Sequence, residues 1–433
     1  MDINVLSRAG MDVLSRMDMN FPSSVNRGDC TRFLTPAWDG DLELLKRYVS
    51  EYDKGDGPAK TVEGIRDRMG HSAFHLAATA GSLDICKYFV EDLKLDVNLK
   101  DALDKTPLHH AIVANRSRIS VYLLENGANP SALAEKRLTP LHCAAYKGCI
   151  KVLELLISRG VEVDAQSDCG TPLQRAALNG KKEAVKILLA NNANPNAFQH
   201  QAFSPLTSAI EAGSVESVKL LLEAGADPNN ESYGQTPIEA ATYKKGTEII
   251  KCLLEAGANP NVTTQWGMTP LEIAALNGDQ KKAKILFPVT SPIPHVTNWT
   301  LEGLMKYNCS EEAANQRKQK QKEQFLLLKS KGDDAFSTRK YDDAMFWYSR
   351  ACELNPLDAA VFSNRSLCCA LLNNGFFALE NAKRCISLKP DWPEAYYREG
   401  VAWKLLKDFP KAAESFNTGL ELDPENKELL LAY

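Results

Sequence analysis

Hydrophobic and polar positions along residues 72–286 follow a pattern that repeats every 32 to 34 residues. Each unit begins with Thr or Ser, has an apolar residue two positions later and soon reaches Ala. The seven starting residues are Ser72, Thr106, Thr139, Thr171, Ser204, Thr236 and Thr269. A second apolar stretch follows within each unit, and residues 185–189 are an example. The pattern predicts two short helices per unit. Because one such unit cannot bury both of its faces, the units should stack side by side and share a core.

The residue types at the ends of the predicted helices support this interpretation. Thr or Ser can accept a hydrogen bond from a free backbone N–H of the first helix, and the Pro that usually follows has no N–H to satisfy. Small residues such as Ala144 and Ala145 let the two helices pack closely. Glycines in the segments "GAN" and "GAD", such as Gly127, Gly225 and Gly257, end the second helix because they tolerate positive φ.

The clearest units read "TPLHHA" at residues 106–111 and "TPLHCA" at residues 139–144. Together with the period, this motif resembles the ankyrin repeat. The resemblance implies a mainly α fold, a solenoid of helix pairs with β-hairpin or loop tips. We expect the array to cover residues 33–289, with a capping repeat at its start and a loop at residues 53–64. Residues 1–32 should form a flexible N-terminal extension.

A second repeat occupies the C-terminal part. Pro356, Pro390 and Pro424 lie 34 residues apart, and so do Gly332, Ser366 and Gly400 in the sites where helices would touch. This pattern resembles the tetratricopeptide repeat (TPR) and implies a three-repeat α-superhelix over residues 323–433. The final segment, "ENKELLLAY", should form a capping helix that ends early, as in a truncated chain.

Residues 290–322 are predicted to be a partly helical linker. Its short basic run consists of Arg317, Lys318, Lys320 and Lys322. The run has two interpretations, a nuclear import signal or acidic contact, and a solvated helix face.

Composition excludes several classes of function. A formal net charge of −4 argues against a nucleic-acid-binding surface, and no apolar run is long enough to insert into a membrane. Most of the eleven cysteines lie on helical apolar faces, among them Cys86, Cys143, Cys252, Cys352 and Cys385. Buried free thiols are typical of a reducing compartment, so we expect a cytoplasmic protein, with the nucleus as a second location. The histidines are not spaced as ligands among the cysteines, so no metal and no cofactor is expected.

No motif of a nucleotide-binding, metal-dependent or serine-nucleophile enzyme is present, so we expect no catalytic residues and no enzyme activity. His75, His109 and His142 should instead hydrogen-bond neighbouring backbone, as this family uses them. The tandem of ankyrin and TPR repeats resembles a group common in plants, which suggests signalling or stress roles. The leading hypothesis is a scaffold or adaptor that binds other proteins or extended peptides, of unknown oligomeric state. The alternative is a co-chaperone that links an ankyrin-bound client to heat-shock chaperone tails.

The resemblance to ankyrin proteins places partner contacts on the hairpin tips and on the exposed side of the first helices. Carried over by position, the contact residues are Lys136, Tyr146, Lys147, Tyr233, Tyr243, Lys244 and Trp266. Aromatic rings beside lysines favour protein binding. The alternative role for Trp266 is to cover the unburied end of the array.

One TPR branch holds the acidic C-terminal tails of the seventy- and ninety-kilodalton chaperones with a clamp of Lys, Asn, Asn, Lys and Arg. By position, Lys329, Asn364 and Arg398 match this clamp, whereas Asp333 and Glu394 replace an Asn and a Lys. Each acidic residue would repel a tail carboxylate, and Glu394 is placed to pair with Arg398 one helical turn later. The sequence therefore disfavours chaperone-tail binding without excluding it.

Overall fold

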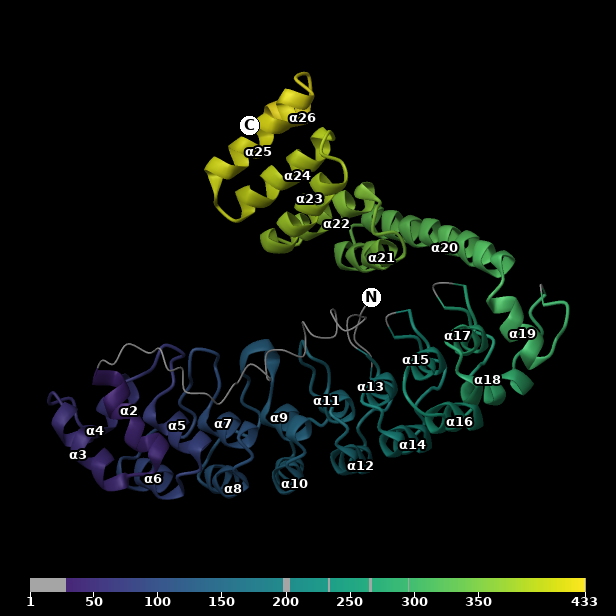
Figure 1. The fold of residues 1–433 in the computed structure, drawn as a ribbon. Coiled ribbons are helices and arrows are strands. Elements are labelled where there is room, and N and C mark those ends of the chain that lie inside the picture. The colour runs from purple at the N-terminus through teal and green to yellow at the C-terminus, as the bar shows by residue number, and fades with distance from the viewer. Residues whose placement is uncertain (1–28, 198–202, 233, 265–266, 295, 433) are drawn as a thin grey trace. The chain divides into compact units, whose positions relative to one another are not determined.

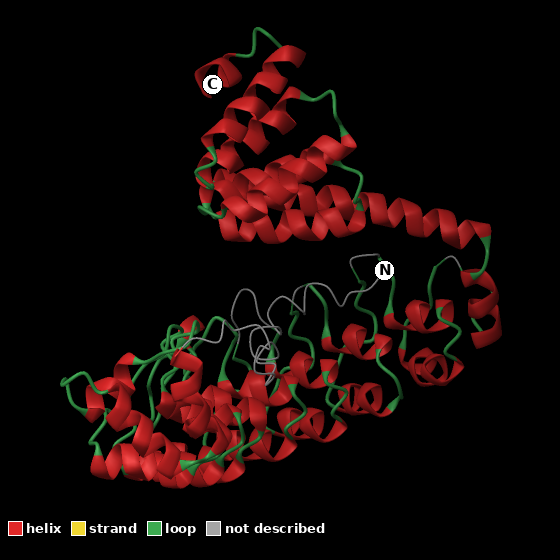
Figure 2. Cartoon of the chain, turned by 60° about the vertical axis from the view of Figure 1, so that its left-hand side comes forward, coloured by secondary structure: helices red, strands yellow, loops and turns green. Residues whose placement is uncertain are grey.

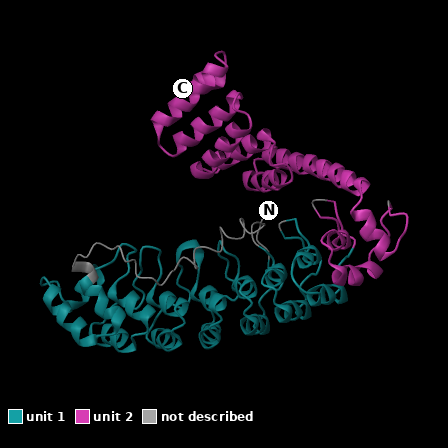
Figure 3. Ribbon diagram, viewed as in Figure 1, with its two compact units in different colours: residues 1–260 teal, residues 261–433 magenta. Residues whose placement is uncertain are grey.

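The computed structural model describes residues 29–197, 203–232, 234–264, 267–294 and 296–432 (Figure 1). Within these ranges the regular elements are helices joined by loops, as Figure 2 shows, and β pairing is limited to isolated bridges such as Ser167 with Gly170. The chain divides into two compact units, residues 1–260 and 261–433 (Figure 3). The predicted mainly α fold is confirmed.

Helix pairs build the first unit. It starts with α2 (Asp29–Asp39), α3 (Leu42–Tyr52) and α4 (Pro58–Gly64). The ankyrin pairs are α5 (Ala73–Ala80) with α6 (Leu83–Lys87), α7 (Pro107–Val113) with α8 (Ser117–Glu125), α9 (Pro140–Lys147) with α10 (Ile150–Ser158), α11 (Pro172–Leu178) with α12 (Lys182–Ala190), α13 (Pro205–Glu211) with α14 (Val215–Glu223), and α15 (Pro237–Tyr243) with α16 (Glu248–Glu255). Helix α6 continues into a π-helical turn at Tyr88–Asp92. Each first helix packs on the first helix of the next pair, as α5 does on α7, so the stack forms one continuous core.

The ends of α9 show why the repeat motif folds this way. Thr139 and His142 cap each other, since the Thr139 hydroxyl lies 2.8 Å from His142 Nδ1, which also accepts the Thr139 backbone N–H at 3.2 Å. Gly148 ends the helix at φ 74°, and its N–H donates to the Ala144 carbonyl at 2.8 Å. His142 Nε2 reaches the Gly170 carbonyl of the next repeat at 3.1 Å. The predicted backbone-binding role of this histidine is confirmed.

The predicted loop at residues 53–64 is wrong in its second half, because residues 58–64 form helix α4. Pro58 occupies the first turn, where its missing N–H has no cost. Val62 is fully buried, and α4 contacts both α3 and α5. Burial of this single valine is a tertiary effect that the polar local sequence does not predict.

The second unit begins with α17 (Pro270–Leu276), α18 (Gln280–Leu286) and a 3₁₀ turn at Phe287–Val289, followed by α19 (Leu301–Asn308). Three helix pairs come next: α20 (Glu311–Ser337) with α21 (Tyr341–Leu354), α22 (Ala359–Leu371) with α23 (Gly375–Leu388), and α24 (Pro393–Leu405) with α25 (Phe409–Leu422). Helix α26 (Lys427–Ala432) packs on α25. The predicted boundary at residue 323 falls inside α20, and the domain limits stay a prediction.

Close helix contacts explain the small residues of the second repeat. A Cβ atom on Gly332 would lie 2.5 Å from Cε1 of Tyr348, a side chain that is only 1% exposed. Helices α20 and α21 can therefore approach only because residue 332 has no side chain. Gly400 faces the ring of Phe416 in the same way.

The basic run on α20 is divided between two environments. Arg317 donates to the Asn308 carbonyl at 3.0 Å, and Lys320 Nζ donates to the Gly267 carbonyl at 2.9 Å. Lys318 and Lys322 are exposed. A solvated helix face therefore describes only two of the four basic residues, since the other two bind backbone within the second unit.

The ten cysteines whose side chains the structure describes are free thiols, and eight of them are buried, including all five that the helical pattern placed on apolar faces. Burial raises the pKa of Cys86 to about 12 and that of Cys143 to about 11. Among the described helices, none combines the length and the hydropathy that a bilayer span requires.

Candidate functional site

The candidate clamp residues of the second unit lie on the first helix of each TPR pair. Lys329 and Asp333 lie on α20, Asn364 on α22, and Glu394 and Arg398 on α24. The spacing of four residues within α20 and within α24 puts each pair on one face of its helix. Helix α22 contacts α24 directly, and α21 packs against both α20 and α22.

Asp333 is held by hydrogen bonds from two other helices. Its Oδ1 accepts the Tyr348 hydroxyl proton at 2.6 Å, and Asn364 Nδ2 lies 3.4 Å from the same oxygen. Burial, reinforced by the hydrogen bond to Asp333, raises the pKa of Tyr348, so this phenol stays a donor. The carboxylate of Asp333 is thus fixed beside Asn364, at the position where the chaperone-binding clamp carries an amide.

Glu394 and Arg398 form the ion pair that their spacing predicts. Oε1 of Glu394 lies 2.5 Å from Nη2 of Arg398, and the two side chains are 28% and 14% exposed. Arg398 Nε also lies 3.4 Å from Ser363 Oγ on α22. Burial raises the pKa of Glu394, and the positive charge of Arg398 only partly offsets this effect. The arginine is therefore occupied, but by a carboxyl group that accepts a proton more readily than an ordinary glutamate.

Lys329 is the least engaged of the retained clamp residues. Its Nζ lies 3.9 Å from Oδ1 of Asp358, which at the same time caps α22 by accepting the Val361 N–H at 3.0 Å. The Lys329 side chain is 28% exposed. Because its contact is long, this ammonium group is the most available partner for an incoming carboxylate.

Sequence reasoning missed two residues of this site. Tyr348 fills the space beside Gly332 between α20 and α21, and its hydroxyl also fixes Asp333. Ser363 precedes the expected Asn364 and joins α22 to α24 through Arg398. A polar group on an otherwise apolar helix face is the only local signal for either role.

The ankyrin candidates of the first unit have varied surroundings. The ring of Tyr146 lies 4.6 Å below the guanidinium group of Arg175, and Lys147 beside it is exposed. Arg175 is only 4% exposed, and its Nε has no hydrogen-bond partner in the described part of the chain. Sequence reasoning missed Arg175. The equivalent positions of the neighbouring repeats carry the uncharged residues Cys143 and Ser208, so a charged residue at this position was the available signal.

Other ankyrin candidates are less available than expected. Lys244 Nζ is paired with Oε2 of Glu211 at 2.7 Å, whereas Tyr243 beside it is 41% exposed. Lys136 lies in a turn at φ 59°, and its carbonyl accepts the Asp168 N–H at 3.1 Å. Tyr233 and Trp266 lie outside the described residues, so the expected aromatic patch around them is untested.

The helix pairs stack side by side, and the first helix of each pair carries polar and aromatic side chains. This arrangement defines a helical-repeat protein with elongated surfaces. A family model for ankyrin repeats matches residues 35–134, 141–232 and 206–293, which is more than half of the chain. The chain belongs to the ankyrin-repeat family. A tetratricopeptide-repeat model matches residues 393–426. Both models describe repeats that mediate protein interactions, and neither describes a catalytic domain.

The TPR region is also similar to parts of Hsp70-Hsp90 organising proteins. The chain is 40% identical over 108 residues to the Hsp70-Hsp90 organising protein of Plasmodium falciparum, covering 25% of this chain and 43% of that protein. It is 42% identical over 102 residues to Hsp70-Hsp90 organizing protein 2 of Arabidopsis thaliana, covering 24% of this chain and 18% of that protein. The chain thus spans less than half the length of these relatives. The solved human ASB11 ankyrin repeat domain is 29% identical, with a TM-score of 0.47, and is matched over 100% of its length and 52% of this chain.

Proposed function

We propose that this protein is an adaptor with two binding surfaces. In this proposal the ankyrin repeats hold a client protein. The TPR groove, by which we mean the surface that carries the clamp residues of α20, α22 and α24, binds the C-terminal tail of a heat-shock chaperone. The observation that carries the proposal is the placement of Lys329, Asn364 and Arg398 on the first helices of three successive TPR pairs. The similarity of the TPR region to Hsp70-Hsp90 organising proteins favours this function over an adaptor for unspecified partners.

In this proposal, the three retained residues bind the terminal carboxylate of the tail. Lys329 Nζ supplies an ammonium group whose ion pair with Asp358 is long, at 3.9 Å, and Asn364 Nδ2 supplies an amide donor. Arg398 supplies the bidentate group that suits a carboxylate. Hydrogen bonds to a charged group contribute about 1.5–3 kcal/mol each, so three of them are enough for a specific but modest affinity.

The charges of Asp333 and Glu394 oppose the binding of a tail carboxylate. Two like charges about 4 Å apart repel by roughly 4 kcal/mol at an effective dielectric constant near 20. Glu394 avoids this cost when it is protonated, and its pKa is already raised by burial. Protonation also frees Arg398 from its ion pair. A bound tail carboxylate raises the pKa of Glu394 further, so binding takes up a proton and becomes tighter as the pH falls.

The test is fluorescence polarisation of the full chain with a labelled peptide that has the acidic C-terminal sequence of a ninety-kilodalton chaperone. The same peptide with a C-terminal amide reports on the terminal carboxylate. We expect saturable binding of the free acid, weaker binding of the amide, and at least a tenfold loss in Lys329→Ala. Lys331→Ala is the matched control, because Lys331 lies two residues away, over the ring of Trp347 at 4.7 Å. Equal binding of acid and amide, or no binding at pH 6, would contradict the proposal.

A further inference from the structure

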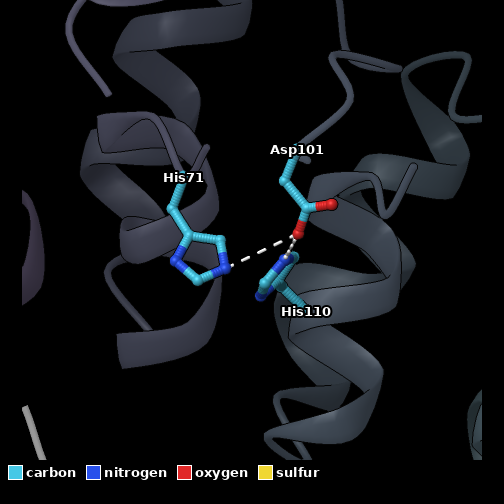
Figure 4. Close-up of side chains that lie close together, drawn as sticks. All are labelled: His71, Asp101 and His110. Carbon is cyan, nitrogen blue, oxygen red and sulfur yellow. Dashed lines mark hydrogen bonds and ion pairs between the residues drawn. The ribbon is translucent and has the colours of Figure 1, made fainter. Parts of the chain in front are cut away.

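Two histidines and one aspartate from two neighbouring ankyrin repeats meet inside the first unit (Figure 4). His71 precedes Ser72, the N-cap of α5, Asp101 lies in the turn before the next repeat, and His110 lies on α7. One ligand-type atom from each residue lies within 4.8 Å of the other two. Oδ2 of Asp101 is 2.8 Å from Nε2 of His110 and 3.6 Å from Nε2 of His71.

The aspartate presents a single oxygen to both imidazoles. Its Oδ1 accepts the backbone N–H groups of Leu103 at 2.8 Å and Lys105 at 2.9 Å, which fixes the carboxylate plane. The Asp101 side chain is fully buried, that of His110 is 5% exposed, and that of His71 is 18% exposed. The group is therefore enclosed, with access from solvent on the side of His71.

Each imidazole has a polar partner at its other nitrogen. Nδ1 of His71 lies 2.8 Å from Oδ2 of Asp67, and Nδ1 of His110 lies 3.3 Å from Oγ1 of Thr79. The Thr79 hydroxyl donates to the His75 carbonyl at 2.8 Å, so its oxygen is free to accept from His110. Outer partners of this kind keep the proton on Nδ1 and orient the lone pair of Nε2 toward a metal.

A hydrogen bond from His110 to Asp101 accounts for only part of this arrangement. It satisfies one imidazole, but the 3.6 Å separation leaves His71 Nε2 beyond hydrogen-bonding distance of the same oxygen. The neighbouring His75 is engaged elsewhere, since its Nε2 lies 3.0 Å from the Leu99 carbonyl and 3.2 Å from the Lys105 carbonyl. His71 therefore points at Asp101 and His110 without a bond of its own to either.

We propose that His71 Nε2, His110 Nε2 and Asp101 Oδ2 bind a zinc ion, with water as the fourth ligand. Zinc bonds to nitrogen and carboxylate oxygen are about 2.0–2.2 Å long, so ligand atoms of a tetrahedral site lie about 3.3 Å apart. The observed separations from Asp101, 2.8 and 3.6 Å, bracket that value. In the metal-free site His110 Nε2 carries the proton that it donates to Asp101. Zinc binding requires the other neutral tautomer, in which Nε2 releases this proton to solvent and Nδ1 takes one up from solvent, so that Nδ1–H donates to Thr79.

Zinc in this position joins two consecutive repeats. His71 belongs to the repeat of α5, whereas Asp101 and His110 belong to the repeat of α7. The ion thus adds a cross-link to the α5–α7 contact. This contact lies near the start of the array, where a repeat has fewer other repeats on one side of it. Its role is structural, and binding should stabilise the first unit.

The test uses the full chain after treatment with a chelator. Isothermal titration with zinc chloride should show one equivalent bound with micromolar or tighter affinity, and the melting temperature should rise by about 5–10 °C when free zinc is about 100 times Kd. His71→Gln, which changes the most exposed ligand, should lose both effects while keeping the circular dichroism spectrum. His142→Gln is the matched control, because the next repeat carries Gln174 at the equivalent position and Gln174 caps its helix in the same way. It should bind zinc like the wild type.

Absence of zinc binding to the wild-type chain would overturn the proposal. So would unchanged binding by His71→Gln, because the ion would then lie at another site. A loss of binding in His142→Gln as large as in His71→Gln would show a general effect of folding and would also overturn it.

Discussion

Replacement of Glu394 by glutamine is the sharpest test of how the TPR groove works. The change keeps the shape of the side chain but removes its charge, and so removes the ion pair with Arg398 at 2.5 Å. Arg398 is then free to bind a tail carboxylate. The same substitution removes a negative charge that repels that carboxylate.

The magnitude follows from the geometry. Repulsion between two charges about 4 Å apart is roughly 4 kcal/mol at an effective dielectric constant near 20. The Glu394 side chain is 28% exposed, so solvent screens part of this repulsion. We therefore take about half of that figure, roughly 2 kcal/mol, which corresponds to about a 30-fold gain in affinity.

The assay is fluorescence polarisation with the acidic tail peptide at pH 7 and at pH 6. Wild-type affinity should rise as the pH falls, because the pKa of Glu394 is raised and tail binding favours its protonated form. Glu394→Gln should bind more tightly at pH 7 and should lose most of this pH dependence. The control is Glu353→Gln, which removes a comparable pair, Glu353 with Arg350 at 3.1 Å, on the second helix of the first TPR pair.

Two results would refute this reasoning. Affinities of wild type and Glu394→Gln within twofold of each other at pH 7 would show that the ion pair does not restrict the groove. An equal gain for the amidated peptide would show that the terminal carboxylate is not what Arg398 binds.

Two further predictions concern stability. Gly332→Ala should destabilise the TPR region by about 1–3 kcal/mol in urea unfolding, because the new Cβ meets Tyr348, which its hydrogen bond to Asp333 holds in place. Gly64→Ala, where an added Cβ meets nothing within 4 Å, should have little effect, and a similar loss in both variants would contradict the packing argument. Burial lowers the pKa of His142 to about 4, so this residue contributes stability above pH 6.5 that is lost as the pH falls toward 4. The free energy of unfolding should fall between pH 7 and pH 4.5, and His142→Gln should make this decrease smaller by roughly 2 kcal/mol. An unchanged decrease would show that His142 does not cause it.

Local interactions were predictable from the sequence. The reciprocal cap of Thr139 and His142 involves residues three apart, and the ion pair of Glu394 and Arg398 involves residues four apart on one helix. Contacts between repeats were not predictable. Lys244 was expected to be available for a partner, but Glu211 from the preceding repeat binds it. Arg175 and Tyr146 stack across two repeats in the same way.

The repeat architecture of this protein follows from the spacing of residue types along its chain. Caps, prolines and small residues recur at fixed spacing because every unit must form the same helix pair and present the same faces to its neighbours. Which polar side chains meet depends on the stacking of the units, because residues about one repeat apart in sequence then become neighbours. That is why Asn364 meets Asp333, and why His71 lies beside the carboxylate of Asp101 that binds His110.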